Sequence, residues 1–317
     1  MVVSGINPRA AWLRRSLAED SVLTKGRRHL PTADAGPAGQ VANRPAARNN
    51  TFLRSREPLG QARHAMKLLD HLDHSGGVFF RLRSYLPLLL LPAFVVSARA
   101  GSHATGLWPP VSETAGVLAA VAGLGLRILT IGVAPSGTSE RSTRDPRASL
   151  LNTSGPYSVV RHPLYLGNTL IAVGLALFTA TWFLPTIVIL ASFLYHERIC
   201  LREEMFLESR FGDAFRTWAD QVPALVPAFA RYRRPAGAFR WKRVLAREFH
   251  ALFVIGAGFL FLDILRHVFG SGRLAASPLW AIVFAVTGLQ FLVLTVLKKW
   301  TRALSDSGPT QAASAGA

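Results

Sequence analysis

Five side chains with ligand-binding chemistry crowd into the stretch 155–167, GPYSVVRHPLYLG, which lies between two long apolar runs. They supply a cation, an imidazole, a helix-starting proline and two phenols: Arg161, His162, Pro163, Tyr157 and Tyr165. Polar groups beside a membrane-type segment cost free energy unless they bind something. We therefore expect a ligand site here rather than a plain connection.

Two adjacent carboxylates, Glu203 and Glu204, close the next long apolar run. The free backbone amides of a helix that starts at Pro163 attract carboxylate or phosphate groups, and the two carboxylates can accept hydrogen bonds from an amine or a ribose. A ligand with a carboxylate, an amine, a ribose and a flat base fits this mixture, and S-adenosylmethionine is such a ligand. A simpler interpretation stays open, in which Arg161 and the two glutamates only form ion pairs at the bilayer surface.

The composition favours a membrane protein. Of 317 residues, 50% are hydrophobic, and the formal net charge is +18. Such a charge suggests a polyanionic partner, either nucleic acid or the anionic face of a bilayer, and the apolar runs favour the bilayer. We expect no nucleic-acid partner. Cys200 is the only cysteine, which excludes an internal disulfide and a thiolate metal cage, so we expect it to be a small buried apolar residue and predict no metal site.

The apolar runs predict an all-α bundle of about six transmembrane helices with a cytoplasmic cofactor site. The expected spans are Tyr85–Ala98, Thr114–Val133, Leu164–Thr181, Leu184–Cys200, Phe249–Phe269 and Leu279–Leu297. The expected organisation is a disordered basic arm (1–64), an amphipathic interfacial helix (65–83), a core of four spans and an interfacial helix (84–230), a basic connector (231–247), two further spans (248–300) and a disordered tail (301–317).

Two features of the second span predict how it packs. Its glycines let another helix approach closely: Gly116, Gly123, Gly125 and Gly132. Arg127 lies inside the same span, so its side chain must point into the bundle or toward a wet cavity.

The distribution of Lys and Arg sets the expected orientation. The N-terminal arm, the loop around Arg144, the connector 231–247 and the tail after Lys298 are basic, whereas the links near Gly101 and Trp182 are not. Six spans with both termini inside place every basic segment in the cytoplasm. Because the third and fourth spans form an antiparallel hairpin, the start of one and the end of the other must meet at the same level.

The motif GPYSVVRHPLYLG and the later stretch HERICLREEMFLESRFGDAFRTWADQVPALVPAF resemble the isoprenylcysteine carboxyl methyltransferase family, integral membrane methyltransferases similar to the phospholipid N-methyltransferases. The shared pattern covers residues 150–229: Gly-x-Tyr, Arg-His-Pro-x-Tyr-x-Gly, a helical hairpin, Glu-Glu-x-x-Leu, Phe-Gly-x-x-Phe and Val-Pro. The resemblance implies that the methyl donor contacts Leu150, Leu151, Asn152, Tyr157, His162, Pro163, Leu164, Tyr165 and Glu203. The substrate-side arginine of the eukaryotic members falls at Ile199 here, with Arg198 next to it, which puts a prenylcysteine substrate in doubt.

The resemblance implies an S-adenosylmethionine-dependent O-methyltransferase acting by direct displacement on an acidic lipid-like carboxylate or phosphate. The Arg- and Ala-rich composition is typical of bacterial proteins, so we expect it in the bacterial inner membrane. Arg161, Arg198 and Glu204 are the expected catalytic residues. The segment 134–144, APSGTSERSTR, resembles the lipid A phosphate methyltransferase branch more weakly, and Arg141, Arg144 and Arg147 there fit an anionic acceptor. Two alternatives stay open: a phospholipid headgroup N-methyltransferase, with Glu204 as its base, and a non-catalytic membrane scaffold or carrier. The sequence leaves the oligomeric state open.

Overall fold

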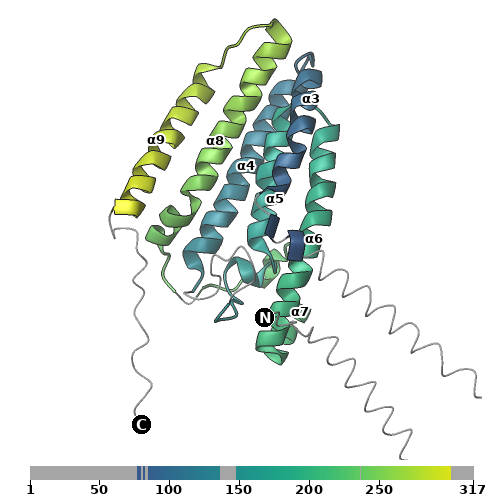
Figure 1. The fold of residues 1–317 in the computed structure, drawn as a ribbon. Coiled ribbons are helices and arrows are strands. Elements are labelled where there is room, and N and C mark those ends of the chain that lie inside the picture. The colour runs from purple at the N-terminus through teal and green to yellow at the C-terminus, as the bar shows by residue number, and fades with distance from the viewer. Residues whose placement is uncertain (1–76, 80, 83–84, 136–147, 236, 301–317) are drawn as a thin grey trace, which may run out of the picture. The chain divides into compact units, whose positions relative to one another are not determined.

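The computed structural model describes residues 77–79, 81–82, 85–135, 148–235 and 237–300. Within these ranges the chain is helical, and its only extended pairing is an isolated antiparallel bridge between Gly155 and Arg233. The elements are η2 (Leu86–Leu90), α3 (Leu91–Gly101), α4 (Trp108–Val133), η3 (Pro156–Ser158), α5 (Pro163–Phe178), α6 (Phe183–Phe211), α7 (Asp213–Gln221), η4 (Phe229–Arg231), α8 (Trp241–Ser271) and α9 (Pro278–Trp300) (Figure 1). The expected N-terminal arm and C-terminal tail lie outside the described residues. So do most of the expected helix at 65–83 and the three loop arginines, Arg141, Arg144 and Arg147.

Four of the described helices, α4, α6, α8 and α9, are long and apolar enough to cross a bilayer. The helices α3 and α5 are also apolar but have only 11 and 16 residues. At about 1.5 Å per residue, α5 is about 24 Å long, less than the roughly 30 Å of a hydrocarbon core. The structure therefore supports an integral membrane protein with four candidate spans, and the count of six stays a prediction.

Three helix links lie together at one end of the helices, at the top of Figure 1. The indole of Trp108, at the start of α4, donates a hydrogen bond to the carbonyl of Ala180 in the α5–α6 link (2.8 Å). A side chain added at Gly270, near the end of α8, would approach the carbonyl of Ser102 in the α3–α4 link (3.5 Å). At the opposite end, Lys298 of α9 donates to the carbonyl of Ala246 in α8 (3.2 Å), so the basic connector and the Lys298 terminus lie at the same end, as expected.

Glycines allow α4 and α5 to pack with their backbones in contact. A methyl group added at Gly123 would lie 2.6 Å from the carbonyl oxygen of Gly167, and one at Gly116 would lie 2.5 Å from that of Gly174. The expectation of close helix packing is thus confirmed for these two positions. It is wrong for Gly125, which has open space beside it.

The fourth glycine of α4, Gly132, is packed closely too, but against the ring of Phe239 in the segment before α8 rather than against another helix.

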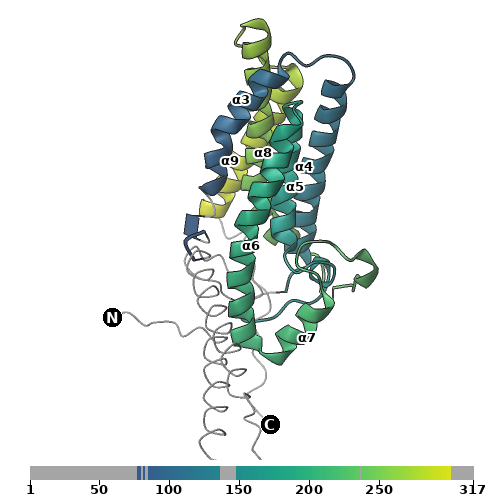
Figure 2. The same ribbon diagram turned by 90° about the vertical axis from the view of Figure 1, so that its right-hand side faces the viewer.

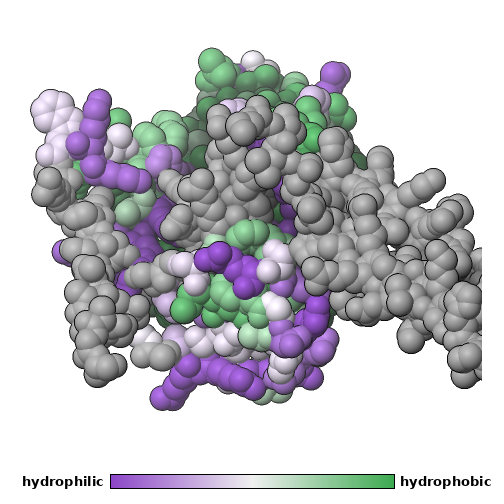
Figure 3. Space-filling view, turned by 60° about the horizontal axis from the view of Figure 1, so that its bottom comes forward, coloured by the Kyte–Doolittle hydropathy of each residue, from purple (hydrophilic) through white to green (hydrophobic). Residues whose placement is uncertain are grey.

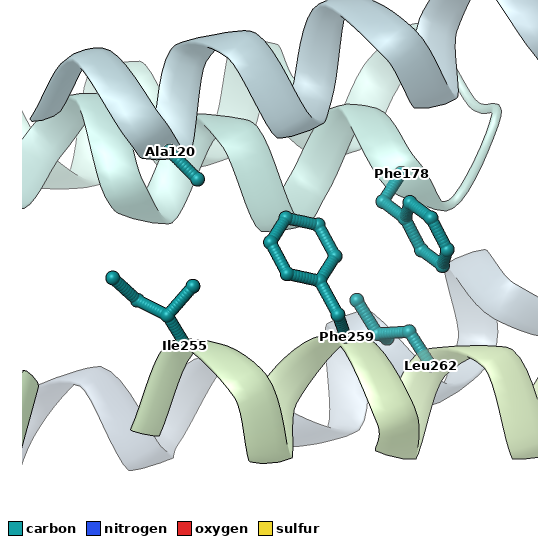
Figure 4. Close-up of a cluster of buried hydrophobic side chains, with 5 residues drawn as sticks. All are labelled: Ala120, Phe178, Ile255, Phe259 and Leu262. Atoms are coloured by element: carbon teal, nitrogen blue, oxygen red, sulfur yellow. The ribbon is translucent and has the colours of Figure 1, made fainter. Parts of the chain in front are cut away.

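The main apolar core joins α8 to α4 and α5. It contains the buried side chains Ala120, Phe178, Ile255, Phe259 and Leu262 (Figure 4). Phe178 meets Phe259 edge to face with 5.0 Å between ring centroids, a favourable aromatic geometry. The C-terminal pair of helices is therefore tied to the core through α8.

A buried ion pair connects α4 to α8. The guanidinium of Arg127 donates two hydrogen bonds of 2.7 Å to the carboxylate of Glu248, and it donates a third to Asn168 of α5. Glu248 is buried. The expectation that Arg127 points into the bundle is confirmed, and its partner lies in the segment that the sequence pattern assigned to the edge of the fifth span.

Two helices extend beyond the expected boundaries. The fourth span was expected to end near Cys200, but α6 continues unbroken to Phe211, where Gly212 with φ of 53° turns the chain into the amphipathic α7 (Figure 2). The positive φ favours glycine, which carries no Cβ to clash. The expected connector 231–247 is helical from Trp241 onward, because Lys and Arg are good helix formers that also suit a helix end at a membrane surface.

Candidate functional site

The start of α5 and the second half of α6 bring the two polar clusters of the sequence into direct contact. Arg161 Nη1 donates to Glu204 Oε2 (2.8 Å), and His162 Nε2 lies 2.9 Å from Glu204 Oε1. Tyr165 donates its phenol proton to Glu203 Oε1 (2.6 Å). The geometric prediction that these clusters meet is confirmed.

The loop before α5 is held by backbone hydrogen bonds from the segment after α7. The N–H of Arg161 donates to the carbonyl of Pro223 (2.9 Å), and that of Ala228 donates to Val159 (2.9 Å). Pro163 is fully buried at the first helical position, where its fixed φ starts the helix without losing a hydrogen bond. The direction in which Arg161 and His162 enter the site is therefore set by buried backbone.

The surroundings of His162 favour the protonated form of its imidazole. Burial alone would lower the pKa of this imidazole, but its interactions with Cys200, Glu203 and Glu204 together raise it well above its ordinary value. Its Nδ1 lies 3.7 Å from Glu203 Oε2, so one imidazolium faces both carboxylates. His162 is thus an electrostatic bridge between the glutamates rather than a proton acceptor.

Tyr157 forms the wall on the side of α7. Its ring packs against the buried cluster of Phe215, Trp218 and Val222, and its backbone carbonyl accepts a hydrogen bond from the Trp218 indole (3.2 Å). Burial, followed by the negative charge of Glu203, raises the pKa of Tyr157. The phenol therefore keeps its proton over the whole physiological range and can act as a donor.

Asn152 Nδ2 and Arg161 Nε are buried nitrogen atoms that have no hydrogen-bond partner in the described part of the chain. The other side of the Asn152 amide is occupied, since its Oδ1 accepts from the backbone N–H of Ser154 (3.2 Å). Buried donors in native proteins are normally paired. One of these donors belongs to Arg161, which contacts the carboxylate pair, and the other lies in the loop before α5, so both are available to a ligand with acceptor oxygens.

The three leucines predicted to contact the methyl donor differ in how deeply they are buried. Leu151 packs against the cluster beneath Tyr157, and Leu164 is half-buried in the first turn of α5. Leu150 is 49% exposed.

Arg198 is not brought into the site. Its ion pair is with its neighbour Glu197 (4.0 Å), and within the described residues it shares no hydrogen bond or ion pair with Arg161, His162 or the glutamates. At about 100° per residue, Arg198 lies about 140° around the helix axis from Glu203. Its catalytic assignment has no support in this arrangement.

Two residues near the site were missed as site residues. Cys200 was expected to be only an apolar filler, but its thiol hydrogen-bonds to His162. His196 lies between the rings of Tyr165 and Tyr195, and its Nδ1 is 3.2 Å from Thr169 Oγ1. The spacing of His196 and Cys200 from Glu203, at seven and three residues, places them on one helix face and is the signal that could have identified them.

Comparison with known proteins agrees with this geometry. Residues 114–214 match the model of the phospholipid methyltransferase family, a stretch that contains most of α4 and all of α5 and α6, with both polar clusters. This match indicates a membrane methyltransferase. No solved structure matches the chain.

Two curated relatives are named for metal resistance. The chain is 39% identical over 83 residues to the cobalt-zinc-cadmium resistance protein CzcN of Cupriavidus metallidurans, covering 26% of this chain and 38% of that protein. It is 34% identical over 87 residues to the nickel-cobalt-cadmium resistance protein NccN of Alcaligenes xylosoxydans xylosoxydans, covering 27% and 40%. The matches thus span less than half of either relative, and no cluster of possible metal ligands occurs in the described ranges.

Proposed function

We propose that this protein is an S-adenosylmethionine-dependent methyltransferase that modifies an acidic, lipid-like acceptor in the membrane. The observation that carries the proposal is the contact between the start of α5 and the carboxylate pair of α6, in which His162 and Tyr165 meet Glu203. This contact lies within the stretch that matches the methyltransferase family model. An isolated ion pair would explain Arg161 and Glu204, but it leaves the buried donors of Asn152 and Arg161 unused.

The described residues fit the methyl donor. When bound, S-adenosylmethionine supplies a methyl group on a positively charged sulfur. The amide of Asn152 and the Arg161 Nε are donors for a carboxylate, whereas Glu203 accepts from an amine or a ribose and Tyr157 offers an aromatic face. The family resemblance assigns the same residues to the donor, together with His162, Pro163, Leu164 and Tyr165.

The state of the charged groups favours an acceptor that is already ionised. Both carboxylate oxygens of Glu204 are already engaged, Oε2 by Arg161 and Oε1 by His162. A carboxylate or phosphate acceptor needs no general base at neutral pH, and holding it in line with the methyl group is enough to accelerate the displacement. An O-methyltransferase therefore agrees best with these contacts.

A phospholipid headgroup N-methyltransferase is the second candidate, and the family match favours it. An ammonium acceptor must lose a proton before it attacks. To act as that base, Glu204 would have to release Arg161 or His162. An anionic acceptor needs no such release.

We place the site at the cytoplasmic side of a six-span protein in the bacterial inner membrane. The basic segments 231–247 and Lys298–Lys299 lie at the same end of the helices as the site, which is the expected cytoplasmic pattern. The methyl donor is a cytosolic compound, so this orientation gives it direct access.

Donor binding is the first test. Purified protein in neutral detergent is titrated with S-adenosylmethionine by calorimetry, with Glu203→Gln as the site variant and Glu208→Gln, on the same helix but paired with Arg216, as the matched control. We expect the wild type and the control to bind and the Glu203 variant to lose about tenfold or more in affinity, since a hydrogen bond to a charged group contributes roughly 1.5–3 kcal/mol. Absence of binding by the wild type would favour a scaffold or carrier.

The acceptor is identified by a second experiment. Protein, radiolabelled S-adenosylmethionine and total membrane lipid are incubated together, and the lipid fractions are separated by headgroup. Label in an acidic lipid fraction supports O-methylation, and it should be alkali-labile in a carboxyl methyl ester but alkali-resistant in a methyl phosphate. Label in an amine headgroup supports the N-methyltransferase.

A further inference from the structure

The segment that connects α7 to α8 has an unusual charge pattern. Residues 222–247 contain no Asp or Glu. Their cations are Arg231, Arg233, Arg234, Arg240, Lys242, Arg243 and Arg247. A charged surface that is simply solvated normally mixes both signs, so this segment presents one sign of charge to its surroundings.

The exposed part of the segment combines cations with apolar side chains. Val226, Phe229 and Tyr232 are 76%, 77% and 56% exposed, and Arg231, Arg233 and Arg234 are exposed among them. We call these six residues the basic apolar strip. Large apolar side chains are rarely this exposed to water in such density, whereas aromatic and basic residues together are typical of the headgroup layer.

The strip is fixed to the loop that precedes α5. The N–H of Gly155 donates to the carbonyl of Arg233 (2.8 Å), and the N–H of Arg233 donates to Ser158 Oγ (2.8 Å). Ala228 is bonded in turn to Val159. Tyr157 therefore lies in a loop that is hydrogen-bonded to the strip at two places.

The strip also lies at the correct level for lipid headgroups. Figure 2 shows the segment between α7 and α8 beside the base of α4 and α5, where the long apolar helices end. Figure 3 looks onto this end, where hydrophilic side chains surround a patch of hydrophobic ones. Trp241, at the start of α8, is exposed at the same end, as an interfacial anchor would be.

We propose that the basic apolar strip binds the phosphate-bearing headgroups of anionic phospholipids and holds an acidic lipid beside the Tyr157 loop. The cations complement the headgroup phosphates, and Val226, Phe229 and Tyr232 enter the acyl boundary beneath them. The part of this proposal that identifies an acidic lipid as the substrate rests on the proposed methyltransferase function. Lipid binding itself needs no methyl donor.

The test measures lipid preference directly. The protein is reconstituted into phosphatidylcholine vesicles that contain spin-labelled phosphatidylglycerol or spin-labelled phosphatidylcholine, and the immobilised fraction of each probe is compared. The site variant carries Arg231→Gln, Arg233→Gln and Arg234→Gln, which leave the backbone bonds intact. The control carries three exposed cations changed elsewhere: Arg99→Gln, Arg273→Gln and Lys299→Gln.

We expect the wild type and the control to prefer the anionic probe and the site variant to lose at least about fivefold of that preference, the factor that one surface cation contributes. High salt should weaken the preference of the wild type in the same direction. If the site variant is folded by circular dichroism and its preference for the anionic probe is unchanged, the proposal that the strip binds anionic headgroups is refuted.

A kinetic readout separates this proposal from the methyltransferase proposal. If the protein methylates an acidic lipid, the site variant should raise KM for that lipid while kcat and the affinity for S-adenosylmethionine stay unchanged. An unchanged KM removes the strip from substrate delivery. Lipid preference that depends on the strip, in a protein that binds no S-adenosylmethionine, would refute the proposed function but keep the binding surface.

Discussion

The charge on His162 is the central feature at the scale of single residues. A buried imidazolium between Glu203 and Glu204 lets two carboxylates lie side by side without repelling each other, and Arg161 adds a second cation on the outer side. Removing one charge from such a group leaves its partners uncompensated. The site should therefore respond to pH through His162.

This charge makes a prediction about stability. The folded-state pKa of His162 is raised above the unfolded value of about 6.5, so its contribution to stability is fully present below that value and is lost as pH rises through the folded pKa. The thermal midpoint of the protein in detergent, followed from acid to alkaline pH, should fall on the alkaline side. His162→Gln should remove this fall, and parallel curves for the two proteins would contradict the assignment.

The residue pairs of the site were predictable because hairpin geometry decides them. Two antiparallel helices with a short link must bring the start of one beside the end of the other, so the meeting of His162 and Tyr165 with Glu203 followed from element order alone. The orientation of Arg198 did not follow, because the sequence fixes its angle on α6 but not which face of α6 meets α5. The unpaired donors of Asn152 and Arg161 could not be predicted either, because they depend on the packing of an irregular loop, which has no sequence periodicity.

At the scale of elements, the contact between α4 and α5 depends on the absence of a single methyl group. Gly123→Ala would bring its methyl 2.6 Å from the carbonyl oxygen of Gly167, and neither backbone can move without separating the helices. We expect a loss of about 1–3 kcal/mol, the cost of overpacking. Gly125→Ala, two residues away with open space, should be neutral or slightly stabilising through helix propensity. Denaturation in mixed micelles measures both, and equal losses would show that the contact is not specific.

The ion pair between α4 and α8 makes a second prediction at this scale. Glu248→Gln leaves the half-buried Arg127 without its neutralising partner, and breaking such a pair costs up to about 3–5 kcal/mol, the value for a fully buried pair. The double change to Met at both positions should recover most of that loss. Glu197→Gln, which weakens the ion pair at 4.0 Å with Arg198 on the surface, should cost well under 1 kcal/mol and serves as the control. A single variant as stable as the double one would show that the pair contributes no coupling.

Helix existence followed from the apolar runs, but helix ends did not. The carboxylate pair was expected to mark the end of the fourth span, yet α6 continues through it because its side chains from Met205 to Phe211 keep a helical pattern that packs on the loop before α5. The end of an apolar run indicates where a span leaves the hydrocarbon of the bilayer. It does not indicate where the helix itself ends, as α6 shows by continuing to Phe211.

At the scale of the whole molecule, the two ends of the helices should face different compartments. The exposed Thr105 and Arg273 lie in the two links at one end, and Asp213, whose side chain is 93% exposed, lies at the other. In a Cys200→Ser background, Thr105→Cys and Arg273→Cys should react with a membrane-impermeant maleimide in intact cells. Asp213→Cys should react only after permeabilisation. The reverse pattern would place the carboxylate pair outside and refute the cytoplasmic site.

The short length of α5 has a consequence for biogenesis. A helix of 16 residues that directly follows Arg161 and His162 is a poor candidate for independent insertion, since it is too short to cover the hydrocarbon and begins beside charged side chains. The ribosome delivers α4 first, however, with its glycines already forming a groove into which the glycines of α5 fit. We therefore expect α5 to leave the translocon already paired with α4, so that a chain split between these two helices would fail to place α5 in the bilayer even when both fragments are synthesised together.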